Sequence, residues 1–228
     1  MTPSESREVG TESDRHGHIP SPPPGRAAFR EAAGWFLEVV AGISGDQWDQ
    51  PGLGEWSVRE LVAHTSRAFT TIEEYLATPA TVEIDSAAEY FRQAVFGVDV
   101  HAAIAERGRT EVRALGDDTA GAVRALAERV LALVDRTPDD TPCATRAGGM
   151  RVGEYLRTRT LELTIHSLDL AAALSASGDP AEPPPAASTE TLVLLAEIAA
   201  LGGGAERATV LRALTGRSEL PPGYNAIG

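Results

Sequence analysis

Three side chains that can bind a metal or move a proton lie at helical spacing in one apolar stretch, LELTIHSLDL, residues 161–170. Glu162 and His166 are four residues apart, and Asp169 follows three residues later. Residues three or four apart share one face of an α-helix, so they form one polar line on an otherwise apolar helix. Buried charges must be paired or coordinated. A carboxylate oxygen and an imidazole nitrogen on adjacent turns can bind one metal ion, so the line predicts a lined cavity with a metal.

A third ligand must come from another helix, because two ligands do not make a site. Besides His166, the histidines outside the N-terminal segment are His64 and His101, and that segment holds His16 and His18. His64 lies between apolar residues in ELVAHTSRAF, which indicates the buried side of a helix, whereas His101 has polar neighbours. We therefore predict a metal site formed by three ligands: His64, Glu162 and His166.

Arg159 and Asp169 extend the polar line and are the candidate catalytic residues. Asp169 would accept a hydrogen bond from a ligand imidazole and orient it, and Arg159 would bind a substrate carboxylate. Ordinary ion pairing fits the same spacing: Glu162 would pair with His166 or Arg159, and Asp169 would pair with a nearby base. Other catalytic motifs, including H-E-x-x-H, G-x-S-x-G and the P-loop, are missing from the sequence. Cys143 lacks a nucleophile motif and is expected to be a passive thiol.

Helical periodicity predicts the elements that position these residues. Helices are expected from residue 26 to about 43, from 57 to about 78, across 86–134 with breaks near Gly97 and at 116–118, and over 153–174. Ser57 and Glu60 form a capping box at the start of the second helix. Residues 137–153 are expected to form a loop or short hairpin, because Pro, Asp and Gly punctuate them. Two short helices follow a Pro/Ala-rich linker.

This pattern predicts an all-α chain built on an antiparallel four-helix bundle with a small helical C-terminal extension. Residues 1–25 are expected to be a disordered tail, 26–176 the metal-binding bundle, and 177–228 the linker and C-terminal helical extension. The alternative is an irregular all-α domain in which the middle segment adds a fifth long helix.

The composition narrows the classes of function. The chain has 228 residues and a formal net charge of −13, which disfavours nucleic acid and anionic membranes as partners. No apolar run approaches the roughly 20 residues that span a bilayer, and the N-terminus lacks the apolar core of a secretory signal. One cysteine cannot form an internal disulfide, so a cytoplasmic location is expected. The sequence leaves monomer and homodimer open.

Two separated motifs resemble a known family. The run W-D-Q-P-G-L-G-E-W-S-V-R-E-L-V-A-H, residues 48–64, and the run R-T-R-T-L-E-L-T-I-H-S-L-D-L, residues 157–170, are similar to the mycothiol-dependent maleylpyruvate isomerase family. The resemblance covers roughly residues 26–175 and implies a DinB-like metal-binding bundle. It also implies that His64, Glu162 and His166 bind a divalent metal, typically zinc, and that mycothiol supplies the nucleophilic thiol.

The resemblance implies a metal-dependent, mycothiol-using enzyme that acts on a small electrophile. It would be a cis–trans isomerase of an activated, maleylpyruvate-like alkene or a thiol S-transferase. The alternatives are a non-catalytic metal- or ligand-binding or sensing bundle and a metal-dependent hydrolase. The chain departs from the family after residue 176, where maleylpyruvate isomerase has a larger α/β domain with a substrate-binding arginine. Arg217, in A-L-T-G-R, is a candidate substitute for that arginine.

Overall fold

The computed structural model describes residues 25–95, 112–113, 115–175 and 182–227. Except for Gly25, the predicted disordered tail lies outside these residues. His101 and the break predicted near Gly97 also lie outside them, as do residues 177–181 of the predicted linker.

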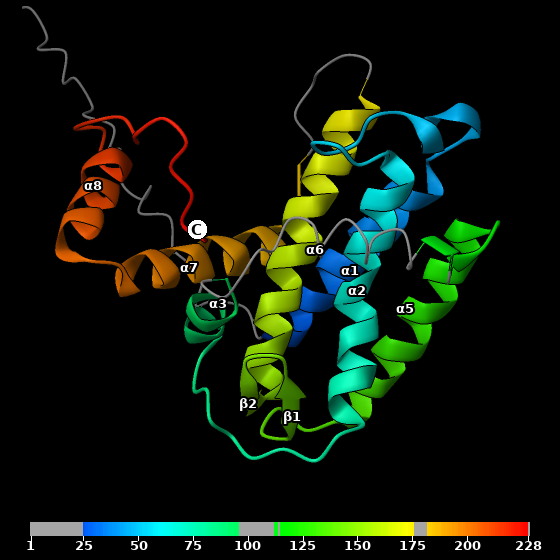
Figure 1. Cartoon of the computed structure of the whole chain (residues 1–228), viewed down its shortest axis with the longest axis horizontal. Coiled ribbons are helices and arrows are strands. Elements are labelled where there is room, and N and C mark those ends of the chain that lie inside the picture. The colour runs from blue at the N-terminus through cyan, green and yellow to red at the C-terminus, as the bar shows by residue number, and fades with distance from the viewer. Residues whose placement is uncertain (1–24, 96–111, 114, 176–181, 228) are drawn as a thin grey trace, which may run out of the picture.

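Four helices form the body of the protein: α1 (Gly25–Ala41), α2 (Val58–Leu76), α5 (Thr119–Arg136) and α6 (Val152–Leu174). Both α1 and α2 pack against α5 and α6, so the four helices enclose one core (Figure 1). This arrangement confirms the predicted all-α, DinB-like four-helix bundle with a helical C-terminal extension.

The start of α2 follows from its capping residues. The backbone N–H of Glu60 donates to Ser57 Oγ at 3.3 Å, and the backbone N–H of Ser57 donates to Glu60 Oε2 at 2.9 Å. These bonds satisfy donors that the first turn leaves without helical partners. The predicted capping box is therefore confirmed, and it places His64 about two turns into α2.

The middle of the chain contains a short helix, α3 (Ala87–Val95), before α5. Asp118 ends the intervening segment by accepting a hydrogen bond from the backbone N–H of Gly121 at 3.0 Å, which caps α5. This confirms the break predicted at 116–118. The described part of the middle segment contains no fifth long helix, because α3 has only nine residues.

A two-stranded antiparallel hairpin precedes α6, with β1 (Pro142–Thr145) paired to β2 (Gly148–Arg151) and Cys143 opposite Met150. The chain after α2 packs directly onto this hairpin, since the backbone N–H groups of Glu83 and Ile84 both donate to Gly149 O. A Cβ atom on Gly149 would lie 1.9 Å from Thr81 O, so only glycine permits this approach. The hairpin thereby sets the path of the chain into α3.

The longest helix, α6, is the centre of the fold. Leu156, Leu163 and Leu170 are fully buried, and α6 packs against α1, α2, α3 and α7. Its charged residues must therefore find partners or face a cavity. α6 is not apolar enough to cross a bilayer, and no helix in the described residues is both long and apolar enough to do so.

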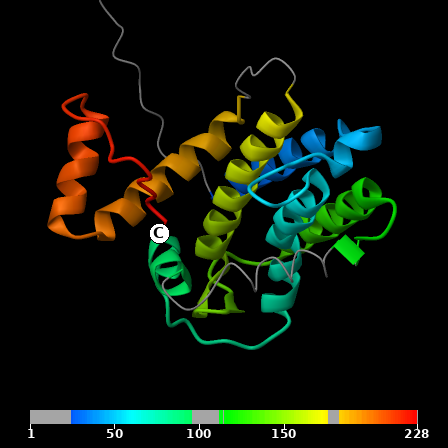
Figure 2. The same ribbon diagram turned by 45° about the horizontal axis from the view of Figure 1, so that its top comes forward.

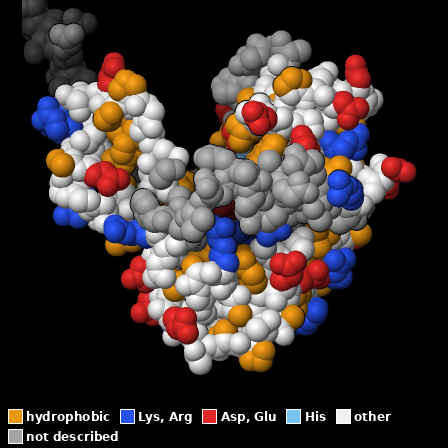
Figure 3. All heavy atoms as spheres, in the orientation of Figure 1, with side chains coloured by type: hydrophobic (Ala, Val, Ile, Leu, Met, Phe, Trp, Pro, Cys, Tyr) orange, Lys and Arg blue, Asp and Glu red, His pale blue; other side chains and the backbone are white. Residues whose placement is uncertain are grey.

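Two helices follow the bundle: α7 (Pro185–Leu201) and α8 (Gly204–Leu214). α7 packs across α1, α3 and α6, whereas α8 contacts α7 and projects away from the bundle (Figures 1 and 2). Arg157 ties α6 to α7 through Glu190 Oε1 at 2.5 Å and Glu197 Oε2 at 2.8 Å. A hollow separates the α8 arm from the body, and acidic and basic side chains are interspersed over this face (Figure 3).

Candidate metal centre

His64 on α2 comes together with Glu162 and His166 on α6. Each offers one ligand atom, and these atoms all lie within 4.8 Å of one another. Glu162 Oε2 is 3.3 Å from His166 Nε2, and the imidazole centroids of His64 and His166 are 5.1 Å apart. Tetrahedral zinc with bonds of about 2.1 Å separates its ligand atoms by about 3.4 Å. The Glu162–His166 pair already has this spacing, and modest side-chain movement would close the widest separation.

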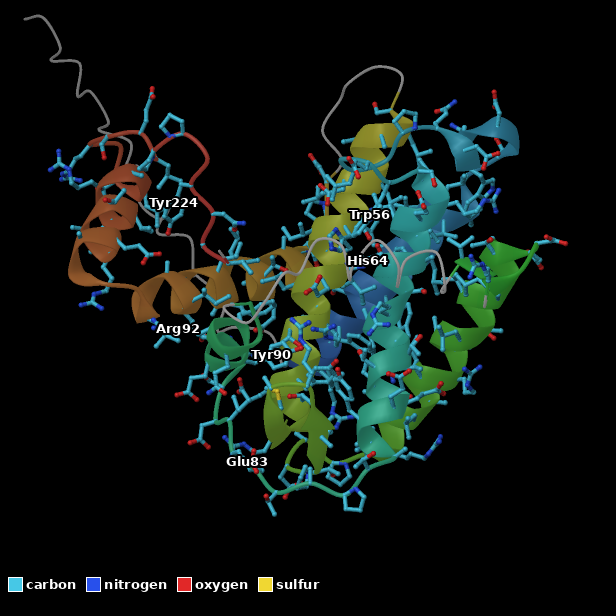
Figure 4. The ribbon with its side chains drawn as sticks, viewed as in Figure 1. Trp56, His64, Glu83, Tyr90, Arg92 and Tyr224 are labelled. Atoms are coloured by element: carbon cyan, nitrogen blue, oxygen red, sulfur yellow. The ribbon has the colours of Figure 1, made fainter. Side chains whose placement is uncertain are left out.

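The loop before α2 also shapes the site. Trp56 immediately precedes the capping residue Ser57, and its indole packs on the imidazole of His64 with ring centroids 4.6 Å apart (Figure 4). Val62 and Ala63 beside His64 are fully buried, which fixes the face of α2 that His64 occupies. His64 is itself half-buried, with one side packed on Trp56 and the other toward α6.

Asp169 holds the imidazole of His166. Its Oδ2 atom lies 3.0 Å from His166 Nδ1, while Nε2 of the same ring faces Glu162. Metal-binding histidines characteristically donate their second ring N–H to a carboxylate in this way, which fixes the ring and its tautomer. The geometry is therefore suited to the orienting role that the sequence suggested for Asp169, although Asp169 does not line the cavity itself.

The protonation of the three groups differs sharply. Burial and the charge of His166 lower the pKa of His64 to about 4, so His64 is neutral at pH 7 with a lone pair to donate. Burial would lower the pKa of His166, but hydrogen bonds to Asp169 and Glu162 raise it to about 9. Burial would raise the pKa of Glu162, but the hydrogen bond from His166 and the charge of Arg159 lower it to about 2. A proton on His166 therefore occupies the position that a cation would take.

Arg159 lies one turn before Glu162 and is nearly buried, with 9% of its side chain exposed. Its guanidinium carbon lies 4.8 Å from the ring centroid of Tyr155 and 6.0 Å from that of Tyr90. Within the described residues, its nearest carboxylate is Glu162 Oε1 at 4.0 Å, and its hydrogen bond is to Thr158 Oγ1 at 3.0 Å. Burial opposes its charge, but Tyr155 and Glu162 keep the pKa of Arg159 raised. Arg159 is therefore a buried cation whose ion pair with Glu162 is long.

A cavity of about 450 Å³ joins the three candidate ligands to Arg159. This volume falls within the range typical of small-molecule sites, about 300–1,000 Å³. α2 and α6 supply most of its lining, and α3, the hairpin turn and the C-terminal segment complete it. Besides the ligands and Arg159, the lining includes Arg67, Thr71, Tyr75, Tyr90, Phe91, Arg146, Tyr155, Ile165 and Ile227.

Comparison with known protein families shows which family the chain resembles. The family described as mycothiol maleylpyruvate isomerase N-terminal domain matches residues 29–171, which include the three candidate ligands and Arg159. The chain belongs to this family. Searches of curated proteins and of solved structures each found no match. Membership of the mycothiol maleylpyruvate isomerase family connects the chain to mycothiol chemistry. The match ends at residue 171, so α7 and α8 both lie beyond it.

Sequence reasoning for this family member missed part of the cavity. Arg67 follows His64 by three residues on α2, so helical spacing was a usable signal for it. Tyr90 and Ile227 gave no such signal, because α3 and the C-terminal segment reach the cavity only through tertiary packing. Arg217, which the resemblance offered as a candidate substrate-binding arginine, is exposed just after α8 and does not line the cavity.

Proposed function

We propose that this chain is a metal-dependent enzyme that uses mycothiol to attack a small electrophile carrying a carboxylate. The observation that carries the proposal is the convergence of His64, Glu162 and His166 at a cavity that also holds the buried cation Arg159. Family membership supports mycothiol as the thiol. Cis–trans isomerisation of an activated alkene and S-transfer to the electrophile are the two reactions that fit.

His64, Glu162 and His166 would hold a divalent metal, with zinc favoured by two imidazoles and one carboxylate. Their chemistry fits this ion, because His64 is neutral, Glu162 is ionised, and Asp169 orients His166. Three protein ligands leave one tetrahedral position for a small molecule, as in catalytic zinc sites. When bound, the ion would supply positive charge that lowers the pKa of a thiol placed beside it.

Arg159 would bind and orient the electrophile. Its charge is buried between Tyr90 and Tyr155, so a substrate carboxylate would provide a closer partner than Glu162, whose Oε1 atom lies 4.0 Å away. That contact would hold the carbon to be attacked near the thiol and stabilise negative charge developing on a conjugated carboxylate. Rotation and expulsion of the thiol would give isomerisation, and retention of the new C–S bond would give S-transfer.

Metal content tests the assignment of ligands. Purified protein should contain close to one equivalent of zinc or a similar ion, and His166→Ala should lose it. Glu73→Gln is a suitable control, since Glu73 lies on α2 with His64 and pairs with Arg129 instead of the candidate ligands. Full metal occupancy in folded His166→Ala and in His64→Ala would remove the proposed site.

Turnover tests the reaction. Metal-loaded protein should consume mycothiol, or isomerise a cis alkene in its presence, when given a panel of small carboxylate electrophiles. Activity without any thiol would favour metal-dependent hydrolysis instead. Stable metal and ligand binding without turnover across the panel would favour a binding or sensing role.

A further inference from the structure

The cavity has two sides with different origins. α2 and α6 form one side and carry the candidate metal ligands and Arg159. Tyr90 and Phe91 of α3 and Ile227 of the C-terminal segment contribute to the remainder. Ile227 lies far beyond residue 171, where the family match ends. Part of the cavity wall therefore comes from a segment that the family match does not include.

The chain after α8 returns to the bundle. Gly216 and Gly223 adopt positive φ angles of 67° and 74°, which turn the backbone where residues with side chains are disfavoured. The segment then runs from the α8 arm back toward α7 (Figures 1 and 2), and Ile227 lines the same cavity as Tyr90 and Phe91 of α3. There Ile227 packs against the hydrophobic core, and its backbone N–H donates to Asn225 Oδ1 at 3.0 Å.

α7 supports both parts of this outer wall. α3 packs against α7, and Arg92 on α3 donates a hydrogen bond to the carbonyl of Leu201 at the end of α7. α8 packs on α7 in turn and carries the segment that ends at Ile227. The C-terminal extension thus positions cavity-lining residues and does not merely follow the bundle.

We infer that Ile227 is a specificity-determining residue that limits the size of the electrophile, an inference that rests on the proposed function. Along α6, Arg159 and His166 are separated by seven residues, or about 10 Å. A small molecule can therefore place its carboxylate at Arg159 and its reactive carbon near the candidate ligands. Ile227 lines the same cavity as Arg159 and the candidate ligands, so its apolar side chain limits the space left for the electrophile beside the thiol. The substrate class is a carboxylate with a compact apolar substituent.

Competitive binding of two carboxylates measures this effect without turnover. Zinc-loaded full-length protein would be titrated with benzoate and with 4-propylbenzoate, with Trp56 beside His64 as a fluorescent reporter and calorimetry as an independent measure. Ile227→Ala removes three carbons and should tighten 4-propylbenzoate about tenfold relative to benzoate. Ile227→Trp should weaken 4-propylbenzoate about tenfold relative to benzoate.

Leu220→Ala is the matched control, since Leu220 lies in the same segment, is 44% exposed, and does not line the cavity. It should leave the ratio of the two dissociation constants unchanged. Equal ratios in unmodified protein and both folded Ile227 variants would overturn the inference, as would failure of unmodified protein to bind either carboxylate. Failure of the proposed function has a separate signature, namely missing zinc or missing thiol turnover in unmodified protein.

Discussion

Asp169→Asn tests whether the contact between Asp169 and His166 serves metal binding. In the native chain, a neutral His166 would donate its Nδ1 hydrogen to an ionised carboxylate across 3.0 Å. The asparagine variant keeps the size of the side chain and a carbonyl oxygen, but it removes the charge. A charge-assisted hydrogen bond contributes roughly 1.5–3 kcal/mol, against roughly 0.5–1.5 kcal/mol for a neutral one. The weaker hydrogen bond by itself should lower the metal affinity about tenfold, at the lower end of the effects seen for such contacts.

The same substitution also changes competition from protons. Asp169 helps to raise the pKa of His166 to about 9, so at pH 7 a metal must displace a proton, at a cost of about 100-fold in affinity. Removing the carboxylate lowers that pKa and weakens the competition. At pH 7 the weaker hydrogen bond to His166 lowers the metal affinity of the variant, whereas the weaker competition from protons raises it. Above pH 9 His166 is already deprotonated, so only the weaker hydrogen bond affects the affinity. The affinity of the variant should therefore fall further below that of the unmodified protein as the pH rises.

A competition titration with a chromophoric chelator at pH 7, 8 and 9 measures both effects. Unmodified protein should gain nearly tenfold in zinc affinity per pH unit below pH 9, and Asp169→Asn should gain less. The control Glu73→Gln, which removes a carboxylate of similar exposure, should follow the unmodified protein. Parallel curves for Asp169→Asn and unmodified protein, or curves that converge with rising pH, would refute the reasoning.

Three further outcomes are expected. Gly149→Ala places a Cβ 1.9 Å from Thr81 O and should cost about 1–3 kcal/mol of stability, measured as a fall in Tm of several degrees without loss of zinc. Burial raises the pKa of Cys143 to about 11, so iodoacetamide at pH 8 should label it only after unfolding, as mass spectrometry would show; rapid labelling of native protein would contradict this. Arg159→Met should raise KM for a carboxylate electrophile about tenfold or more while zinc content is retained, and an unchanged KM would exclude a carboxylate contact at Arg159.

The residues beyond the family match contribute to both stability and the cavity. Arg157 makes ion pairs with Glu190 and Glu197 on α7, and it lies on the same helix as Arg159 and Glu162. α7 therefore braces the helix that carries most of the candidate site. α7 also packs against α3 and against α8, which carries the segment with Ile227.

Local sequence determined the helices and most of the candidate site. Ser57 and Glu60 cap α2 through bonds within four residues, so the start of that helix was readable directly. The spacing of Glu162, His166 and Asp169 required only helical geometry to place them on one face. Both patterns depend on contacts within one or two turns, which a single sequence displays.

Tertiary structure decided which distant residues meet. The approach of His64 to the α6 residues depends on how α2 packs against α6, and the family resemblance supported this pairing before the structure did. Periodicity gave no information on Tyr90 or Ile227, because α3 and the final segment reach the cavity through contacts with α7. Such packing depends on the fit of surfaces far apart in the chain, and no local pattern of residues encodes that fit by itself.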